Sequence, residues 1–362
     1  MRWLLLPLAV CLLLLIPIDR KLRGMELVAL NATSGNVALV TRHAPAPQLK
    51  IDTLRVAGTD LPVSVWGSGR WLAGPRLVLA NGVVRDGRNY GPLVVLARSL
   101  ARVGFEVAVP ELFAYRELRL HAQDVGVMEA AIGGPDPADA VVGISVGGSL
   151  GMIAASRRVD PPPVVAIGPY GELQQLLAAV LTGQFEHRGQ PVPYRPAGFV
   201  GQVVRDTVLA QMSPADAVRL KPVFSDPGSA GPELAGHLSS SGRAVLELFR
   251  VTDHRHVPSV VAGLPPRLRM LLSELSPTFW VGGGTGRAVV FHFSGDPYFP
   301  HQGSQLLIEQ FGPRGQLFDS GLIDHGELVL PAISPQSLTD HYLPETVRFL
   351  GFVDAALEAT GF

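Results

Sequence analysis

The stretch ADAVVGISVGGSLGMIAAS, residues 138–156, runs a short β-branched segment directly into a serine set among glycines. Residues 140–144 are expected to form a buried strand, and residues 146–157 a helix. Ser145 falls at their junction and Ser149 one turn inside the helix, each in a Gly-x-Ser-x-Gly pattern. A tight strand-to-helix turn tolerates only small neighbours and lifts its serine hydroxyl above the sheet. Ser145 is therefore the candidate nucleophile, and the glycines around Ser149 are expected to allow close packing of the helix on the sheet.

Outward from this stretch, short apolar strands alternate with helices of about a dozen residues. A hairpin is expected from residue 53, strands at 76–82, 105–113 and 162–171, and helices at 90–104 and 119–132. The apolar strands lack clean alternation, as expected for strands buried on both faces. Crossover helices between such strands predict an α/β fold with a mostly parallel sheet flanked by helices.

Residues 172–285 interrupt this alternation with helical stretches joined by Gly- and Pro-rich segments, and no strand is predicted there. The alternation then resumes with a strand at 287–296, a helix at 301–311, a strand at 315–320 and a closing helix. We therefore expect a core made of residues 53–171 and 286–362, with 172–285 inserted as a helical cap over the edge of the sheet where strands end.

Composition limits the chemistry. The chain has 362 residues, 47% of them hydrophobic, and a formal net charge of −1, so nothing in its charge points to nucleic acid. Cys11 is the sole cysteine, which excludes disulfides within the chain, cysteine-based zinc sites and iron–sulfur clusters. No cofactor or metal is predicted, and catalysis must use hydroxyls, carboxylates and imidazoles. The sequence does not indicate an oligomeric state.

The N-terminal segment is apolar from Trp3 to Ile18 and is followed by charged residues. This run is short for a bilayer span, which usually needs about 20 residues, but no small-x-small cleavage site follows it cleanly. Residues 1–24 are predicted to be an uncleaved membrane anchor and residues 25–52 a tether, with a cleaved signal peptide as the alternative. Charges flank both ends of the run, so the side of the membrane stays open.

Several ordered segments carry a family resemblance: RLVLANG (76–82), GISVGG (143–148), FHFSGDPYFP (291–300) and LFDSGLIDHGEL (317–328). Together they resemble the α/β-hydrolase superfamily, in particular its bacterial esterases and dienelactone-hydrolase-like members. The family's order of nucleophile, acid and histidine along the chain is reproduced.

The resemblance implies a role for five residues. Ser145 corresponds to the nucleophile, Asp296 to the acid and His325 to the base. The backbone N–H groups of Val83 and Val146 correspond to the oxyanion donors. The implied chemistry is cleavage of a small carboxylic ester through an acyl-enzyme.

Two positions depart from the family pattern. Asn81 stands where the family has histidine, and Phe293 where it has glycine. The first change alters the loop that carries the oxyanion donor, and the second is expected to reshape the approach to Asp296. Glu172, after the preceding strand, and Asp324 remain alternatives for the acid.

Other histidines and motifs are assigned lesser roles. His301 follows the Asp296 loop too closely to turn back on it, and His341 begins a predicted helix. The run Asp253–His256 lacks a third spaced cluster and is interpreted as a solvated loop. The glycines of 282–286 precede a strand and are interpreted as the hinge returning from the cap. An acyltransferase with the same triad, and a non-catalytic membrane-associated binding protein on this scaffold, remain alternative functions.

Overall fold

The structure is a computed structural model of the full chain. The residues that it describes are 20, 22–31, 33, 45–68, 74–113, 115–226, 228, 231, 233–283, 286–293, 295–320, 323–324, 327–328 and 343–361.

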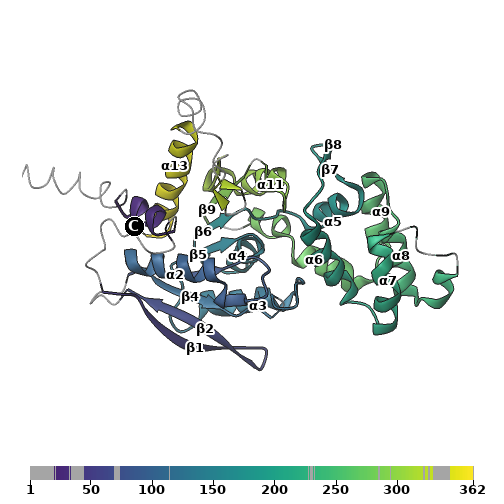
Figure 1. Ribbon diagram of the computed structural model, residues 1–362, viewed down its shortest axis with the longest axis horizontal. Helices are drawn as coiled ribbons and strands as arrows, with labels where there is room; N and C mark the ends of the chain where they lie inside the picture. Colours follow the sequence, from purple (N-terminus) through teal and green to yellow (C-terminus); the bar gives the residue numbers. More distant parts are fainter. Residues whose placement is uncertain are drawn as a thin grey trace, which may run out of the picture.

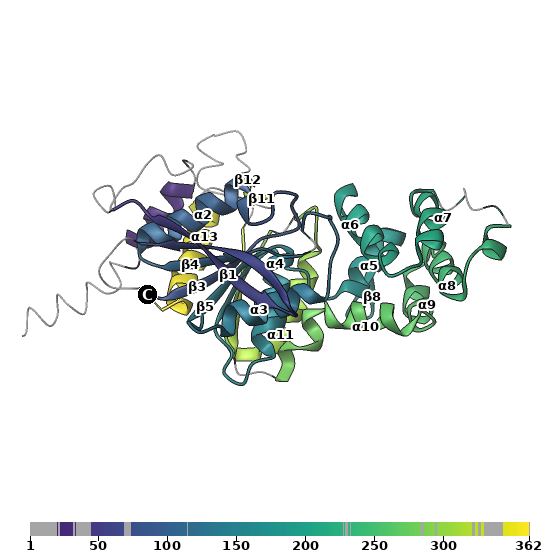
Figure 2. The same cartoon turned by 90° about the horizontal axis from the view of Figure 1, so that it is seen from below.

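Eight strands form one sheet in the order β1-β2-β4-β3-β5-β6-β9-β10 (Figures 1 and 2). β2 pairs antiparallel with β1 and with β4, and the remaining neighbours are parallel. The mostly parallel sheet predicted from the sequence is thereby confirmed. The strands are β1 (Gln48–Val56), β2 (Thr59–Gly67), β3 (Arg76–Ala80), β4 (Glu106–Pro110), β5 (Ala140–Ile144), β6 (Val164–Ile167), β9 (Ala288–His292) and β10 (Gly315–Asp319).

Helices cover both faces of the sheet. Successive residues of a strand point to opposite faces, and the buried strands are apolar at both, so each face needs a covering layer. In β3, Leu77 and Leu79 pack with α2 and α13, whereas Val78 and Ala80 pack with α3 and α4. α11 adds to the second face. The helices are α2 (Gly91–Val103), α3 (Gln123–Gly133), α4 (Val146–Ser156), α11 (His301–Phe311) and α13 (Leu343–Ala359).

The segment between β6 and β9 forms a mainly helical cap, which extends away from one end of the sheet (Figures 1 and 2). It also contains a small antiparallel hairpin that the sequence did not predict. Each strand of this hairpin has four residues, and the second contains Pro191 and Pro193, so its pattern is weak. Arg188 and Gly189 make the turn with φ of 52° and 76°. The elements are α5 (Leu173–Thr182), β7 (Gln184–His187), β8 (Gln190–Pro193), α6 (Gly198–Leu209), α7 (Pro214–Ser225), α8 (Ser240–Phe249), α9 (Val257–Ala262) and α10 (Pro266–Glu274).

A helix over residues 22–31, called here the N-terminal helix, lies against α2 and α13. Its Leu30 side chain is buried, Gly24 faces Val353 of α13, and the Arg23 guanidinium donates a hydrogen bond to the Val103 carbonyl. This packed helix includes residues 25–31 of the segment predicted as a tether over 25–52, of which residues 32 and 34–44 lie outside the described residues.

None of the helices in the described ranges is both long enough and apolar enough to cross a membrane. The apolar run from Trp3 to Ile18, on which the predicted anchor rests, lies outside the described residues.

Candidate active site

Ser145 occupies a strained turn between β5 and α4. Its φ of 57° and ψ of −129° are a combination that side-chain-bearing residues rarely adopt. A Cβ added to Gly143 would lie 2.4 Å from the Gly148 Cα, and one added to Gly147 would lie 2.5 Å from the Asn81 carbonyl oxygen. The glycine pattern is therefore required by close backbone packing. The turn places the serine at the carboxyl edge of the sheet, where ligands bind in open α/β folds.

Ser149 has a structural role. It is fully buried, and its hydroxyl donates to the Tyr170 carbonyl at 2.9 Å and accepts from the Tyr170 N–H at 3.0 Å. These bonds join α4 to the loop after β6. Gly151 packs α4 closely on β5, because a Cβ there would lie 2.8 Å from the Val141 Cγ1.

The two backbone N–H groups expected as oxyanion donors border the same cavity as Ser145. Val146 follows the serine, and Val83 follows Gly82 at the end of β3. Gly82 presses against the serine, since an added Cβ would lie 2.9 Å from the Ser145 Cβ. Within the described part of the chain, neither Val83 nor Val146 donates its N–H to another protein atom. Both groups can therefore bind a ligand oxygen.

Asp296 lies in the loop after β9 and is only 3% exposed. Its Oδ1 accepts hydrogen bonds from the N–H groups of Tyr298 at 2.7 Å and Phe299 at 3.2 Å, while the Tyr194 hydroxyl donates to its backbone carbonyl. Tyr298 and Phe299 also line the Ser145 cavity. The carboxylate is thus held in a fixed orientation close to that cavity.

His292 contacts Asp296, and sequence reasoning assigned it no role. Its Nε2 lies 3.5 Å from the Asp296 Oδ2 and 3.2 Å from the Phe299 carbonyl, and its Nδ1 lies 2.7 Å from the Ser304 hydroxyl. The ring is fully buried. Because its neighbours Phe299 and Asp296 are acceptors, it is suited to bracing the Asp296 loop. The signal was present in the sequence, because His292 begins the same motif, residues 292–300, that contains Asp296.

His325, the expected base, lies outside the described residues, as does His341. On either side of His325, β11 (Ile323–Asp324) pairs antiparallel with β12 (Glu327–Leu328). The side chain of Asp324 also lies outside the described set. The structure therefore brings Ser145, the two N–H donors and the Asp296 loop to one end of the sheet, and the histidine stays a prediction.

Two further alternatives are placed. His301 starts α11 with its ring 5.4 Å from that of His292, and burial lowers its pKa. Glu172 stands directly before α5, where its side chain makes no capping hydrogen bond, and its partial burial raises the pKa of its carboxyl. A raised pKa favours the neutral acid, whereas a residue that orients an imidazolium must be ionised. The N–H groups of Tyr298 and Phe299 fix the orientation of the Asp296 carboxylate, which an orienting acid also requires.

Comparison with known proteins gives weak likenesses. No protein-family model and no curated protein matches the chain. Similar solved structures include the esterase of the archaeon Pyrobaculum calidifontis, with 14% identity, 94% of this chain and 92% of that chain covered, and a TM-score of 0.48. Another is the acylaminoacyl peptidase of Pyrococcus horikoshii, with 10% identity and a TM-score of 0.48. The match covers 86% of this chain and 42% of the peptidase. An alpha/beta hydrolase from Sphaerobacter thermophilus has 17% identity and a TM-score of 0.41. The match covers 83% of this chain and 99% of that hydrolase. This chain spans less than half of the peptidase's length.

The assignment of the fold rests on the molecule itself. The strand order, the antiparallel β2, and a strained serine between β5 and α4 occur together here. The chain has the α/β-hydrolase fold. In this fold the loops at the carboxyl ends of the strands build the site, and an insertion after β6 is placed to cover it.

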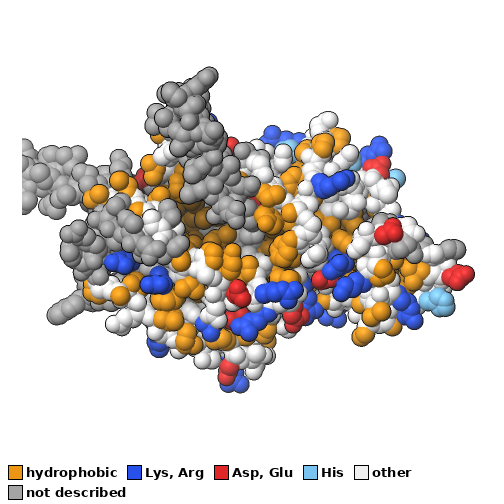
Figure 3. Space-filling view, in the orientation of Figure 1, with side chains coloured by type: hydrophobic (Ala, Val, Ile, Leu, Met, Phe, Trp, Pro, Cys, Tyr) orange, Lys and Arg blue, Asp and Glu red, His pale blue; other side chains and the backbone are white. Residues whose placement is uncertain are grey.

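The cavity that borders Ser145 has a volume of about 620 Å³. The core contributes the loop after β3 and residues of α2, and the cap contributes Phe199, Val200, Val203 and Val204 of α6. Figure 3 shows hydrophobic side chains gathered along this face between core and cap. Most of the residues that line the cavity are apolar.

Asn81, which replaces the family histidine, lines this cavity and is 6% exposed. Its backbone carbonyl accepts a hydrogen bond from the Tyr115 hydroxyl, so the loop is held by its main chain. Its side-chain nitrogen is buried and has no hydrogen-bond partner among the described residues. An unpaired buried amide costs about 1–3 kcal/mol, which a polar ligand atom can offset.

Phe293, which replaces the family glycine, was expected to reshape the approach to Asp296, but its side chain points away from Asp296. Its side chain packs edge-on against Phe291 at a centroid distance of 5.1 Å, on the face covered by α2 and α13. His292 points to the opposite face, toward α11. The approach to Asp296 is thus formed by other residues, because successive strand residues alternate in direction.

The remaining motifs are structural in the described region. Asp253 caps a short 3-10 turn by accepting from the Arg255 N–H, and it pairs with the Arg255 guanidinium at 2.5 Å. That guanidinium holds the pKa of Asp253 well below its ordinary value. No group of three potential metal ligands occurs among the described residues. Of residues 282–286, Gly284 and Thr285 lie outside the described residues.

Proposed function

We propose that the protein is a serine hydrolase that cleaves carboxylic esters, with Ser145 as nucleophile, His325 as base and Asp296 as acid. One observation carries this proposal. Ser145 is held in a strained turn beside a cavity in which the N–H groups of Val83 and Val146 have no partner within the described chain. Strain and unpaired donors are retained where a ligand uses them.

The proposed reaction has two steps, formation and hydrolysis of an acyl-enzyme. His325 takes the hydroxyl proton of Ser145 as the oxygen attacks the ester carbonyl carbon. The carbonyl oxygen gains negative charge and receives hydrogen bonds from the Val83 and Val146 N–H groups. When the tetrahedral intermediate collapses, the C–O bond to the alcohol breaks and His325 returns the proton to the leaving alkoxide. Water then attacks the acyl-enzyme in the same way and releases the acid.

Asn81 adds a polar contact in this scheme. Asn81 lines the same cavity as the serine, and a rotation of its side chain would let the buried, unpartnered amide nitrogen donate to a substrate oxygen. Apolar residues of α6 surround the rest of the cavity and favour substrates with an apolar part.

A fluorophosphonate probe tests the assignment. Purified wild-type protein should be labelled, and Ser145→Ala should lose labelling and at least ~10⁴-fold in ester hydrolysis. Ser259→Ala, an exposed serine of α9, is the matched control and should match the wild type. A folded wild type that resists the probe would remove the enzymatic reading in favour of a binding protein. Labelling that survives Ser145→Ala would show that another serine reacts.

The apolar run from Trp3 to Ile18 completes the proposal as a membrane anchor for this enzyme. In cell membranes washed with alkaline carbonate, the full chain should stay in the pellet, and a chain that begins at residue 20 should move to the supernatant. A full chain released by carbonate would contradict the anchor.

A further inference from the structure

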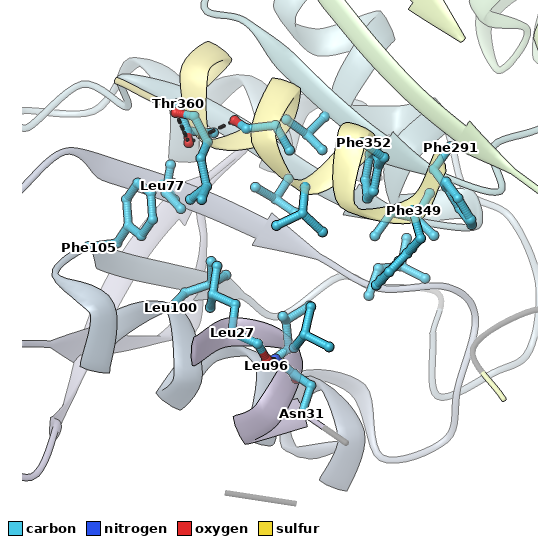
Figure 4. A pocket seen from close by; sticks show the side chains of 18 of the residues that line it. Leu27, Asn31, Leu77, Leu96, Leu100, Phe105, Phe291, Phe349, Phe352 and Thr360 are labelled. Carbon is cyan, nitrogen blue, oxygen red and sulfur yellow. Dashed lines mark hydrogen bonds between the residues drawn. The ribbon is translucent and has the colours of Figure 1, made fainter. Parts of the chain in front are cut away.

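A second cavity lies on the face of the sheet covered by α2 and α13 (Figure 4). Its volume is about 280 Å³. Leu27 and Leu96 lie on one side, from the N-terminal helix and α2, and Phe349 and Phe352 of α13 lie on the other. The strands form its floor. We call it the apolar cavity.

The wall of the apolar cavity offers little to water. Of its described lining residues only Asn31 and Thr360 have polar side chains. The Asn31 amide donates to the Leu27 carbonyl at 2.8 Å, and the Thr360 hydroxyl donates to the Ala356 carbonyl at 2.9 Å. A buried water needs two to four polar partners, so an apolar group suits this space better.

The apolar cavity adjoins the cavity of Ser145. Leu96, Ile144 and Asn31 line both, and Ile144 is the residue directly before the candidate nucleophile. The two cavities therefore meet at these shared side chains, past which the acyl chain of an ester bound at Ser145 would run.

Phe293, a position where the sequence departs from the family pattern, lines the apolar cavity. It stands where the resembled motif has glycine, and its ring forms part of the wall together with Phe291. The aromatic ring adds apolar surface to the wall of the cavity that a glycine would not provide.

We propose that the apolar cavity binds the acyl chain of the substrate, which makes the substrate an ester of a medium-chain fatty acid. This proposal rests on the proposed function of Ser145. An apolar cavity of ~150 Å³ holds benzene, so by the same ratio 280 Å³ holds a chain of roughly ten carbons.

A series of p-nitrophenyl esters from acetate to palmitate tests the proposal with the full chain. The value of kcat/KM should rise by up to about fourfold for each added methylene, reach its maximum near decanoate, and fall for longer chains. A maximum at acetate or butyrate would overturn the proposal.

Filling the cavity provides the second arm. Ala356 lines it from α13, and Ala356→Phe should lower kcat/KM for decanoate at least tenfold while leaving acetate within about threefold. Val28→Phe, on the N-terminal helix, should act in the same direction and replaces the first variant if that one fails to fold. Val347→Phe, at an exposed position of the same helix α13, is the matched control and should keep the wild-type preference.

The outcomes separate this proposal from the proposed function. Probe labelling at Ser145 with an unchanged chain-length preference in both filled variants would overturn the acyl subsite and leave the hydrolase intact. Absence of labelling and of turnover for every ester would overturn the hydrolase itself. Hydrolysis independent of chain length, with saturable decanoate binding by Ser145→Ala, would make the cavity a lipid site unconnected with the reaction and would also overturn the proposal.

Discussion

The Ser145 cavity and the apolar cavity share part of their wall, but they differ in how many polar groups lack a hydrogen-bond partner. Around Ser145 the described chain holds a strained backbone, two N–H groups without partners and a buried amide nitrogen without a partner. Around the apolar cavity, the amide of Asn31 donates to the Leu27 carbonyl and the hydroxyl of Thr360 donates to the Ala356 carbonyl. Unpaired polar groups cost stability, and their concentration around Ser145 is the reason for placing the reacting ester group there in the proposed function. The lack of such groups in the other cavity is the reason for placing the acyl chain there.

Among variants that keep Ser145, substitution of the proposed acid Asp296 should lower kcat the most. Asp296→Asn retains an oxygen that can accept from the Tyr298 and Phe299 N–H groups, so the loop should keep its form. The base loses its anionic partner, and kcat should fall by ~10³–10⁴. Steady-state kinetics and a thermal unfolding curve measure both parts. Near-wild-type turnover in Asp296→Asn would move the acid elsewhere, with Glu172 the first residue to examine.

Gly82→Ala should give the next largest effect. The new Cβ would lie 2.9 Å from the Ser145 Cβ and 3.0 Å from its hydroxyl oxygen, so the loop carrying Val83 must shift. Loss of one oxyanion donor lowers kcat by ~10²–10³. Gly67→Ala, where an added Cβ meets nothing within 4 Å, serves as the control. If both variants keep full turnover, the Val83 N–H takes no part.

Asn81→Leu distinguishes function from stability at a single position. Removing the unpartnered amide should leave the free energy of unfolding unchanged or raise it by up to ~1 kcal/mol, because an apolar group of similar shape needs no partner. The value of kcat/KM should fall about tenfold as the substrate contact is lost. Denaturant unfolding and ester kinetics provide the two readouts, and exposed Asn89→Leu should change neither. A less stable but fully active Asn81→Leu would contradict the assignment.

Glu172→Gln should have the smallest effect. Burial raises the pKa of Glu172, so the folded state binds this proton more tightly than the unfolded state. Stability contributed by that proton is complete below the ordinary pKa of 4.5 and is lost as the pH rises through the raised value. The variant should therefore unfold up to ~2 °C higher than wild type at pH 7 and show no gain near pH 4. Ester turnover should be unchanged; a large loss would instead support Glu172 as the acid.

Local pattern determined much of the fold. The β5 strand at residues 140–144 and the α11 helix at residues 301–311 have the predicted bounds, because β-branched runs and helical spacing act over a few residues. The small hairpin of the cap was missed, because its strands are short and contain proline. The sequence did not predict the N-terminal helix, whose packing against α2 and α13 depends on residues far away in the chain.

The sequence by itself determined the alternation of strands and helices, the glycine-flanked serine and the order of the candidate residues along the chain. Only the tertiary structure decided that Ser149 is tied to Tyr170, that His292 braces the Asp296 loop, that Phe293 faces away from that loop, and that Asn81 is left unpaired beside Ser145. Backbone propensity and hydrophobic periodicity are local properties. Which buried polar group finds a partner, and which cavity a side chain lines, depend on residues far apart in the chain that packing brings together.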